Sequence, residues 1–136
     1  MINLQLHHIG LATRSLEMDK DSLLLLGFEQ ESNLFFDPIQ KINCLFMKQN
    51  HVRIEIIEPT STDSPVTEII ARGHKMYHQC FECTDIYKTI DYLCSKGAHL
   101  LSPPVPAIAF EGRNICFLIL RSMLIVELIE KSNEVL

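Results

Sequence analysis

The stretch "HVRIEIIE", residues 51–58, returns near the end of the chain as "MLIVELIE", residues 123–130. Both stretches are typical of β-strands, because branched aliphatic residues dominate them and neither glycine nor proline interrupts them. Each carries a glutamate among apolar residues, Glu55 in the first and Glu127 in the second. The neighbours of Glu127 are apolar on both faces of its strand, and a buried carboxylate without a partner is costly. The pattern therefore predicts a duplicated fold and a special role for the two glutamates.

The repetition continues upstream of these strands. The segment "KINCLFM", residues 41–47, aligns with "RNICFLI", residues 113–119, and this alignment places Cys44 over Cys116. The segment "HIGLATRSL", residues 8–16, aligns with "HQCFECTDI", residues 78–86. We therefore predict one domain, residues 1–136, built from two repeats at about residues 4–58 and 75–130.

Each repeat has the same predicted order of elements, β-α-β-β-β. The first helix is expected from Ser15, a typical N-cap, to Gly27, and the second from Asp85 to Gly97. A short linking helix, about residues 64–73, is expected between the repeats, with Ser64 as N-cap and Pro65 at its first position. The apolar stripe predicted to bury the second helix consists of Ile86, Ile90, Leu93 and Cys94.

Composition limits the classes of function. The chain has 136 residues, 47% of them hydrophobic and 21% charged, with a net charge of −5. A negative chain is a poor partner for nucleic acid, and no apolar run approaches the roughly 20 residues that a bilayer requires. The start "MINLQLHH" lacks the pattern of a secretion signal, so we expect a cytoplasmic protein without nucleic-acid or membrane partners.

Five cysteines include a C-x-x-C pair, Cys80 and Cys83, which could indicate a zinc or redox site. The surrounding segment "MYHQCFECTD" is typical of a strand, on which residues three apart point to opposite faces. One metal ion could not easily reach both sulfur atoms. We therefore expect all five cysteines to be reduced structural thiols.

Ligand-type side chains occupy matching positions in the two repeats. His8 begins the repeat that Glu55 ends, and His78 begins the repeat that Glu127 ends. If a pseudo-twofold axis relates the repeats, these four side chains can converge on one point. Two imidazoles and two carboxylates suit a single divalent ion such as Zn, Ni, Co, Mn or Fe. The cation would also offset the repulsion between two buried carboxylates.

Structural interpretations of the same residues stay open at this stage. A histidine on a strand is more often structural than a ligand, and a strand glutamate often keeps its carboxylate in water. His7 and His51 are further histidines near the two strands. The two glutamates could instead pair with nearby arginines, namely Arg53, Arg113 or Arg121.

At these residues the chain resembles the vicinal oxygen chelate superfamily, which includes glyoxalase I, methylmalonyl-CoA epimerase, extradiol dioxygenases, and fosfomycin and bleomycin resistance proteins. Within this superfamily it is most similar to the epimerase-like members. The matching stretches, which together span most of the chain, are "LHHIGLATRSL", "LLGFE", "VRIEIIEPTSTDSPV", "MYHQCFECTDI" and "LIVELIE".

The resemblance implies an α+β fold, the glyoxalase/bleomycin resistance fold, in which paired βαβββ modules form an open barrel-like cup, usually in homodimers. It implies one divalent metal ion and a small-molecule substrate that chelates the metal through vicinal oxygens. The metal would stabilise an enolate while a carboxylate, Glu127, moves a proton. The implied metal ligands are the four residues that the repeat singles out, namely His8, Glu55, His78 and Glu127.

The chain also departs from the epimerase pattern. Epimerases carry a proton-transferring glutamate shortly before the third strand, and the matching position here is Ile39, with Asp37 and Gln40 close by. The late loop "PPVPAIAFEGRNICFL" replaces a small glycine-rich stretch. In this loop Glu111 could supply the missing group, or the segment could be a solvated turn around Gly112. The loop's candidate substrate-binding residues are Phe110 and Arg113.

Three functions follow in order of preference. The first is a divalent-metal-dependent lyase or isomerase that acts by enolate chemistry, other than a true methylmalonyl-CoA epimerase. The second is a non-catalytic binder of a small molecule or antibiotic, of the resistance type. The third is an extradiol-type dioxygenase, which is disfavoured because Glu55 as a fourth protein ligand would crowd the oxygen-binding position. The sequence does not decide whether the site forms within one chain or across a dimer.

Overall fold

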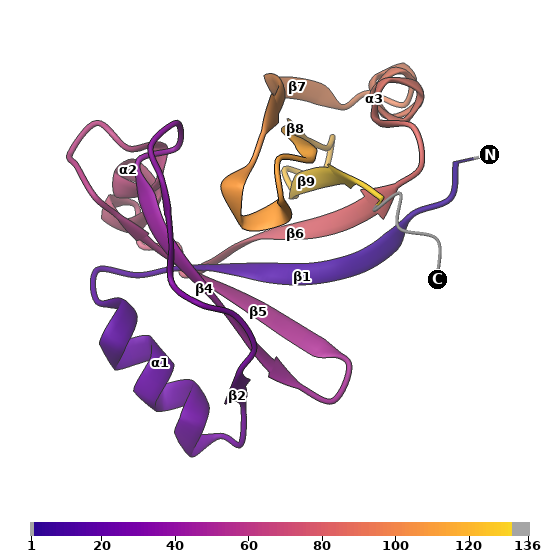
Figure 1. Ribbon diagram of the computed structural model, residues 1–136. Coiled ribbons are helices and arrows are strands. Elements are labelled where there is room, and N and C mark those ends of the chain that lie inside the picture. The colour runs from indigo at the N-terminus through magenta and orange to yellow at the C-terminus, as the bar shows by residue number, and fades with distance from the viewer. Residues whose placement is uncertain (1, 132–136) are drawn as a thin grey trace. The chain divides into compact units, whose positions relative to one another are not determined.

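The computed structural model describes residues 2–131, which divide into two compact units. The first unit consists of His8–Tyr77. The second unit consists of residues 2–7 and 78–131 of the described chain. Each unit contains a mixed β-sheet (Figure 1). Each unit also has its own apolar core. No helix in residues 2–131 is long and apolar enough to span a membrane.

The first unit has a sheet in the order β2-β4-β5-β1, and the short strand β3 also pairs with β4. β1 and β5 run parallel, while β2, β3 and β5 run antiparallel to β4. β2 and β3 lie along different parts of β4, so together they take the place of one interrupted strand. The elements are β1 (Gln5–Ala12, from His8 onward), α1 (Leu16–Leu25), β2 (Glu29–Gln30), β3 (Phe35–Asp37), β4 (Ile42–Gln49), β5 (Val52–Pro59) and α2 (Pro65–Ala71).

The second unit repeats this arrangement with a sheet in the order β6-β9-β8-β7. β6 and β9 are parallel, and β8 is antiparallel to both β9 and β7. The predicted β-α-β-β-β order is therefore present in this unit without interruption. The elements are β6 (Met76–Cys83, from His78 onward), α3 (Ile86–Ser95), β7 (His99–Pro106), a short 3-10 helix (Ile108–Phe110), β8 (Asn114–Ile119) and β9 (Ile125–Glu130).

Helix ends follow the local chemistry that the sequence predicts. The Ser15 hydroxyl accepts a hydrogen bond from the Met18 amide at the start of α1, and the Asp85 carboxylate accepts one from the Lys88 amide at the start of α3. α1 and α3 are followed by Gly27 and Gly97, both in the left-handed region, where glycine avoids a steric penalty. The linking helix α2 begins after Ser64, which caps it, as predicted.

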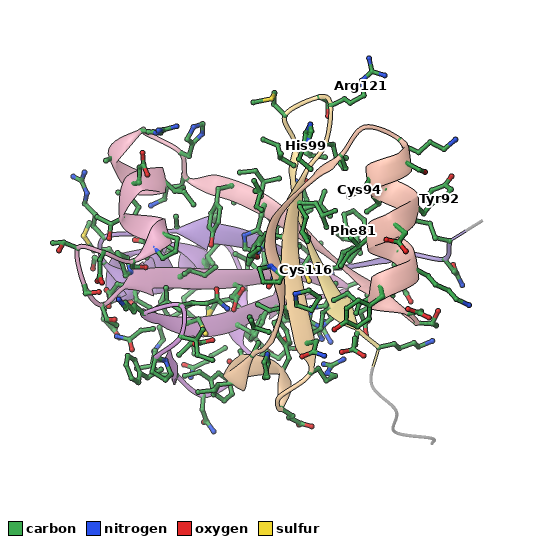
Figure 2. All side chains as sticks on the ribbon, turned by 90° about the horizontal axis from the view of Figure 1, so that it is seen from above. Phe81, Tyr92, Cys94, His99, Cys116 and Arg121 are labelled. Atoms are coloured by element: carbon green, nitrogen blue, oxygen red, sulfur yellow. The ribbon has the colours of Figure 1, made fainter. Side chains whose placement is uncertain are left out.

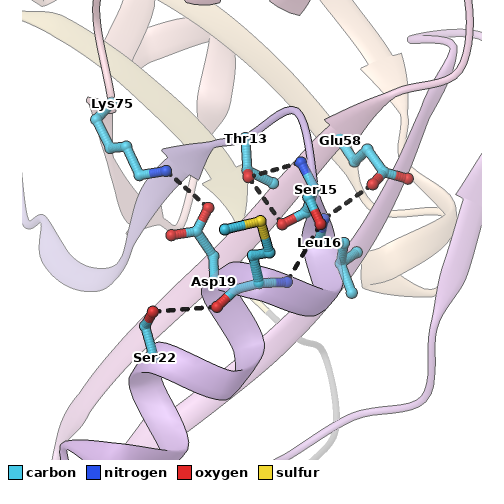
Figure 3. Close-up of polar contacts among 8 residues, drawn as sticks. Thr13, Ser15, Leu16, Asp19, Ser22, Glu58 and Lys75 are labelled. Atoms are coloured by element: carbon cyan, nitrogen blue, oxygen red, sulfur yellow. Dashed lines mark hydrogen bonds and ion pairs between the residues drawn. The ribbon is translucent and has the colours of Figure 1, made fainter.

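The start of α1 carries a second acceptor that the sequence did not indicate. A carboxylate oxygen of Glu58, near the end of β5, accepts a hydrogen bond of 2.8 Å from the Leu16 amide (Figure 3). On the next turn, Asp19 forms an ion pair with Lys75 at 2.7 Å (Figure 3). A negative charge at a helix N-terminus is stabilised by the helix dipole. The glutamate three residues after Glu55 therefore has a structural role.

One face of each sheet packs against a helix. In the first unit α1 covers a core that includes Leu45, Met47 and Ile56. In the second unit α3 covers a core that includes Leu118 and Leu128. Burying such a side chain contributes roughly 1.5–3 kcal/mol, so these two cores are the main source of stability. Because side chains alternate along a strand, the residues between these positions point to the opposite face.

The buried stripe of α3 differs from the predicted one. Ile86, Thr89 and Ile90 are buried, whereas Cys94 is exposed (Figure 2). Leu93 is partly buried against the core, so the prediction is wrong at Cys94, and the buried face includes Thr89 instead. Its hydroxyl donates a hydrogen bond of 2.8 Å to the Asp85 carbonyl, which satisfies the polar group locally.

All five cysteines are free thiols, as predicted, and Cys94 is the exposed one. Cys80 and Cys83 both lie on β6, where three-residue spacing directs them to opposite faces. Burial raises the pKa of Cys83, and it raises the pKa of Cys116 to about 12. The two thiols therefore stay protonated and behave as small apolar side chains.

Candidate functional site

A histidine and a glutamate meet on the face of the first sheet that α1 does not cover. The parallel pairing of β1 with β5 places Gly10 beside Glu55, so that His8, two residues earlier, lies on the same face. The His8 Nε2 atom is 3.1 Å from Glu55 Oε1, and both side chains are buried. Phe46 on β4 lies opposite Glu55, and its ring packs edge-on against His8 at 5.3 Å.

The second sheet contains the same group on its helix-free face. β6 and β9 place Cys80 beside Glu127, so His78 again lies on the side of the glutamate. The distance from His78 Nε2 to Glu127 Oε1 is 3.1 Å, and Glu127 is only 2% exposed. Phe117 on β8 lies opposite Glu127 and packs edge-on against His78 at 5.3 Å.

The two aromatic rings correct the alignment of the repeats. Strand pairing makes Phe46 equivalent to Phe117, since each lies opposite the glutamate of its unit. The predicted superposition of Cys44 on Cys116 is therefore wrong by one residue. The cause is the hairpin loop: Gln49 pairs with Val52 across residues 50–51, whereas the Leu120 amide bonds to the Leu124 carbonyl across residues 121–123.

Each His–Glu pair has a geometry that suits metal ligation. Two ligand atoms about 2.1 Å from one ion and at right angles to each other are about 3.0 Å apart. A hydrogen-bonded pair has a similar separation, so the distance alone does not distinguish the two cases. Each unit supplies one imidazole nitrogen and one carboxylate oxygen as possible ligand atoms. These atoms lie in buried and otherwise largely apolar surroundings.

The arginines that could have paired with the two glutamates have other contacts. Arg53 donates two hydrogen bonds to Glu31, at 2.5 and 2.8 Å. Arg113 donates to the carbonyl oxygens of Phe110 and Glu130. The side-chain stem of Arg121 lies against Gly97, at the end of α3 (Figure 2).

The two further histidines near the strands, His7 and His51, belong to neither His–Glu pair. His7 precedes His8 on β1. It packs edge-on against Phe110 within the second unit, with 5.6 Å between ring centroids. His51 is exposed in the turn between β4 and β5.

The late loop forms a compact turn. Phe110 is buried at the end of the 3-10 helix, and the Arg113 guanidinium stacks over its ring at 5.8 Å. Arg113 also lies 3.7 Å from the carboxylate of Glu82. Glu111 is exposed and occupies the left-handed region next to Gly112. Of the two interpretations of this segment, the observed contacts favour the turn.

The position that matches the epimerase glutamate is also a turn. Ile39 is exposed between β3 and β4. Asp37 is buried, and one of its carboxylate oxygens accepts hydrogen bonds from the amides of Ile39 and Gln40, at 2.9 and 3.1 Å. Asp37 therefore stabilises the turn and is not available to replace a catalytic base.

Comparison with known proteins agrees with this arrangement. An uncharacterized protein of Bacillus subtilis, YqjC, is 27% identical over 96% of this chain and 94% of its own length. The crystal structure of a hypothetical protein from Bacillus halodurans is 24% identical, covers 98% of this chain and 99% of that one, and has a TM-score of 0.86. A methylmalonyl-CoA epimerase variant from Streptomyces coelicolor, in complex with 2-nitronate-propionyl-CoA, is 22% identical, covers 95% of both chains and has a TM-score of 0.79.

The family model of the glyoxalase/bleomycin resistance protein/dioxygenase superfamily matches residues 7–117, and the chain belongs to this superfamily. The predicted fold class, α+β with paired βαβββ modules, is thereby confirmed. Members of the superfamily typically bind a divalent metal ion and small-molecule ligands such as CoA derivatives.

Proposed function

We propose that the chain is a divalent-metal-dependent lyase or isomerase of the glyoxalase or epimerase type, acting on a small oxygen-chelating substrate. The observation that carries the proposal is the duplication of a buried His–Glu pair, 3.1 Å apart in both units. A structural pair in one core need not recur at the equivalent place in another. A shared metal site accounts for the recurrence, because both halves must then supply ligands.

The proposed ligands of a single ion are His8, Glu55, His78 and Glu127. Two imidazole nitrogens and two carboxylate oxygens fit Zn, Ni, Co, Mn or Fe in the divalent state. The cation also offsets the two negative charges, which would otherwise repel each other in a buried place. An ion held by these four residues would retain the capacity to bind oxygen atoms of a substrate.

The bound metal would act as a Lewis acid that stabilises negative charge on a substrate oxygen. Glu127 is the proposed proton-transferring group, because its buried carboxylate is shielded from water and belongs to the proposed ligand set. Glu111 is the proposed second group, and its exposed side chain is accessible to a ligand. Phe110 and Arg113 remain candidate substrate contacts. We also propose that the protein is a homodimer.

Metal content tests the proposal most simply. Purified wild-type protein and the variants His8→Ala, His78→Ala and His51→Ala would be incubated with mixed divalent metals, desalted and analysed for bound elements. We expect about one ion per chain in the wild type and in His51→Ala, whose exposed histidine serves as the matched control. Loss of the ion in His8→Ala and in His78→Ala is expected, and retention in either variant would contradict the proposal.

A non-catalytic binder is the second candidate, favoured by the exposed Ile39 at the position of the usual base. Enolate chemistry exchanges the α-proton of a thioester or hemithioacetal with solvent, whereas binding alone does not. Candidate substrates in D₂O, followed by NMR, would separate the two functions. Metal-dependent exchange that Glu127→Gln abolishes supports the enzyme, and tight binding without exchange supports the binder.

A further inference from the structure

An imidazole and a thiol lie close together in the second unit. His7 on β1 offers a ring nitrogen and Cys80 on β6 offers its sulfur, and these two atoms are within 4.8 Å of each other. Neither residue is one of the four proposed ligands of the divalent ion. The pair is therefore a separate group of metal-binding atoms within one unit.

Cys80 differs from the other buried thiols of this unit. Cys83 and Cys116 belong to the apolar core that α3 covers. Cys80 is three residues before Cys83 on β6, so it points to the opposite face of the sheet, which is the face of His78. It is completely buried. A buried thiol often serves as a small apolar side chain, but Cys80 lies on the face that carries a histidine and a glutamate.

The first unit shows that the fold does not require these two side chains. Strand pairing places Cys80 beside Glu127 and Gly10 beside Glu55, so Gly10 is the equivalent of Cys80. Counting one residue back from the histidine of each His–Glu pair, His7 corresponds to Tyr77. The first unit therefore has neither the sulfur nor the imidazole at these places. Both atoms are additions that the strand geometry does not explain.

The separation of the two atoms fits a shared ion. An imidazole nitrogen lies about 2.0–2.1 Å from a bound zinc ion, and a thiolate sulfur lies about 2.3 Å from it. Two such ligands are about 3.6 Å apart in tetrahedral geometry and about 4.4 Å apart on opposite sides of the ion. Both values fall within the 4.8 Å limit for His7 and Cys80. One ion can therefore contact both atoms after at most a small side-chain adjustment.

The type of donor decides which ion the pair prefers. Thiolate sulfur selects soft ions such as Cu⁺, whereas a group with two carboxylates suits harder divalent ions. His7 is partly exposed, so solvent reaches one member of the pair. Its ring packs edge-on against Phe110, with 5.6 Å between centroids, and this contact limits the rotation of the imidazole.

We propose that His7 and Cys80 form a binding site for Cu⁺, separate from the site proposed for the divalent ion. The Cys80 thiol releases its proton to solvent as the sulfur–copper bond forms, and copper keeps its oxidation state. The His7 nitrogen donates its lone pair to the same ion.

Competition for Cu⁺ under anaerobic conditions tests the proposal. Each protein would be titrated against a chromogenic Cu⁺ chelator, whose absorbance reports the copper that the protein removes. Cys80→Ser would be compared with Cys94→Ser, which removes the exposed thiol of the same unit. His7→Ala would be compared with His51→Ala, which removes an exposed histidine outside the pair.

The wild type is expected to hold one Cu⁺ per chain. Cys94→Ser and His51→Ala should match it, while Cys80→Ser and His7→Ala should each bind Cu⁺ at least about tenfold more weakly, because each loses a ligand. His78→Ala should keep the copper, since His78 belongs to the other group of ligands. X-ray absorption of copper-loaded Cys94→Ser should show a sulfur ligand together with imidazole nitrogen.

Three results would overturn the proposal: no retained copper in the wild type, undiminished affinity in Cys80→Ser, or loss of copper in His78→Ala. The last result would place the ion at the His–Glu pair. Circular dichroism of each variant separates loss of a ligand from loss of the fold. Should Cys80→Ser unfold, the X-ray absorption measurement decides alone, and absence of a sulfur ligand there contradicts the proposal.

Discussion

The two units carry the same histidine, glutamate and phenylalanine but differ in what lies beside them. In the first unit the strands next to Glu55 end in Lys48 and Arg53, whereas in the second the matching positions are Ile119 and Ile125. The helices differ as well. At the start of α1, a carboxylate oxygen of Glu58 accepts a hydrogen bond from the Leu16 amide. The shared histidines and glutamates are those proposed to bind the metal. The differing residues show that the fold tolerates either charged or apolar side chains at this end of the sheet.

The largest expected change in the free energy of unfolding comes from substitutions in the apolar cores of the two units. Met47→Ala in the first unit and Leu128→Ala in the second each remove a fully buried side chain beneath a helix. Each should lower the free energy of unfolding by about 2–5 kcal/mol, through lost burial and a cavity. Urea denaturation followed by circular dichroism measures the change.

The matched control is Leu25→Ala, at a leucine that is 88% exposed on α1. It should change the free energy of unfolding by less than about 0.5 kcal/mol. A small effect at Met47 with a large one at Leu128 would show that the cores of the two units do not contribute alike.

A smaller effect is expected at the start of α3. Asp85 accepts a hydrogen bond of 3.1 Å from the Lys88 amide, so Asp85→Ala should cost about 1 kcal/mol in thermal or urea unfolding. Asp85→Asn keeps the acceptor and should cost little. Equal losses in both variants would mean that the charge at Asp85, rather than the cap, stabilises the helix.

Helix boundaries were predictable because their causes are local. Ser15, Ser64 and Asp85 cap their helices through side chains only two or three residues from the amides they accept, and the sequence displays this spacing directly. The pairing of His8 with Glu55 also followed from the repeat, although they are far apart in the chain. What sequence could not supply was the length of a hairpin loop.

The unequal lengths of the two hairpin loops explain two findings that the sequence analysis did not predict. One additional residue in the loop at residues 121–123 shifts β8 by one position, so aligning identical cysteines gave the wrong equivalence. With the register corrected, Phe117 falls opposite Glu127, as Phe46 falls opposite Glu55. The phenylalanines were visible in the sequence, and counting outward from each hairpin loop would have found them. The contact from Glu58 to Leu16 depends on tertiary packing and had no local signal.

The smallest expected effect is a change in how the stability of the protein depends on pH, and it arises from Glu31 in the first unit. Arg53 holds the pKa of Glu31 below its usual 4.5. A folded-state pKa below the unfolded one gives stability that is present above the unfolded pKa and is lost as pH falls through the folded value. Between about pH 6 and about pH 3 the wild type should lose up to about 1 kcal/mol more than Glu31→Gln. An identical pH dependence in both proteins would show that the ion pair adds no stability.

The central claim is that both units supply ligands to one ion, and counting nitrogen ligands tests it most directly. Pulsed EPR of protein loaded with one equivalent of Cu²⁺ reports the number of coordinated imidazoles. We predict two imidazoles in the wild type and in His51→Ala, and one in His8→Ala and in His78→Ala. A single imidazole in the wild type, with a second equivalent of metal binding equally well, would show that each His–Glu pair acts alone and would contradict the account.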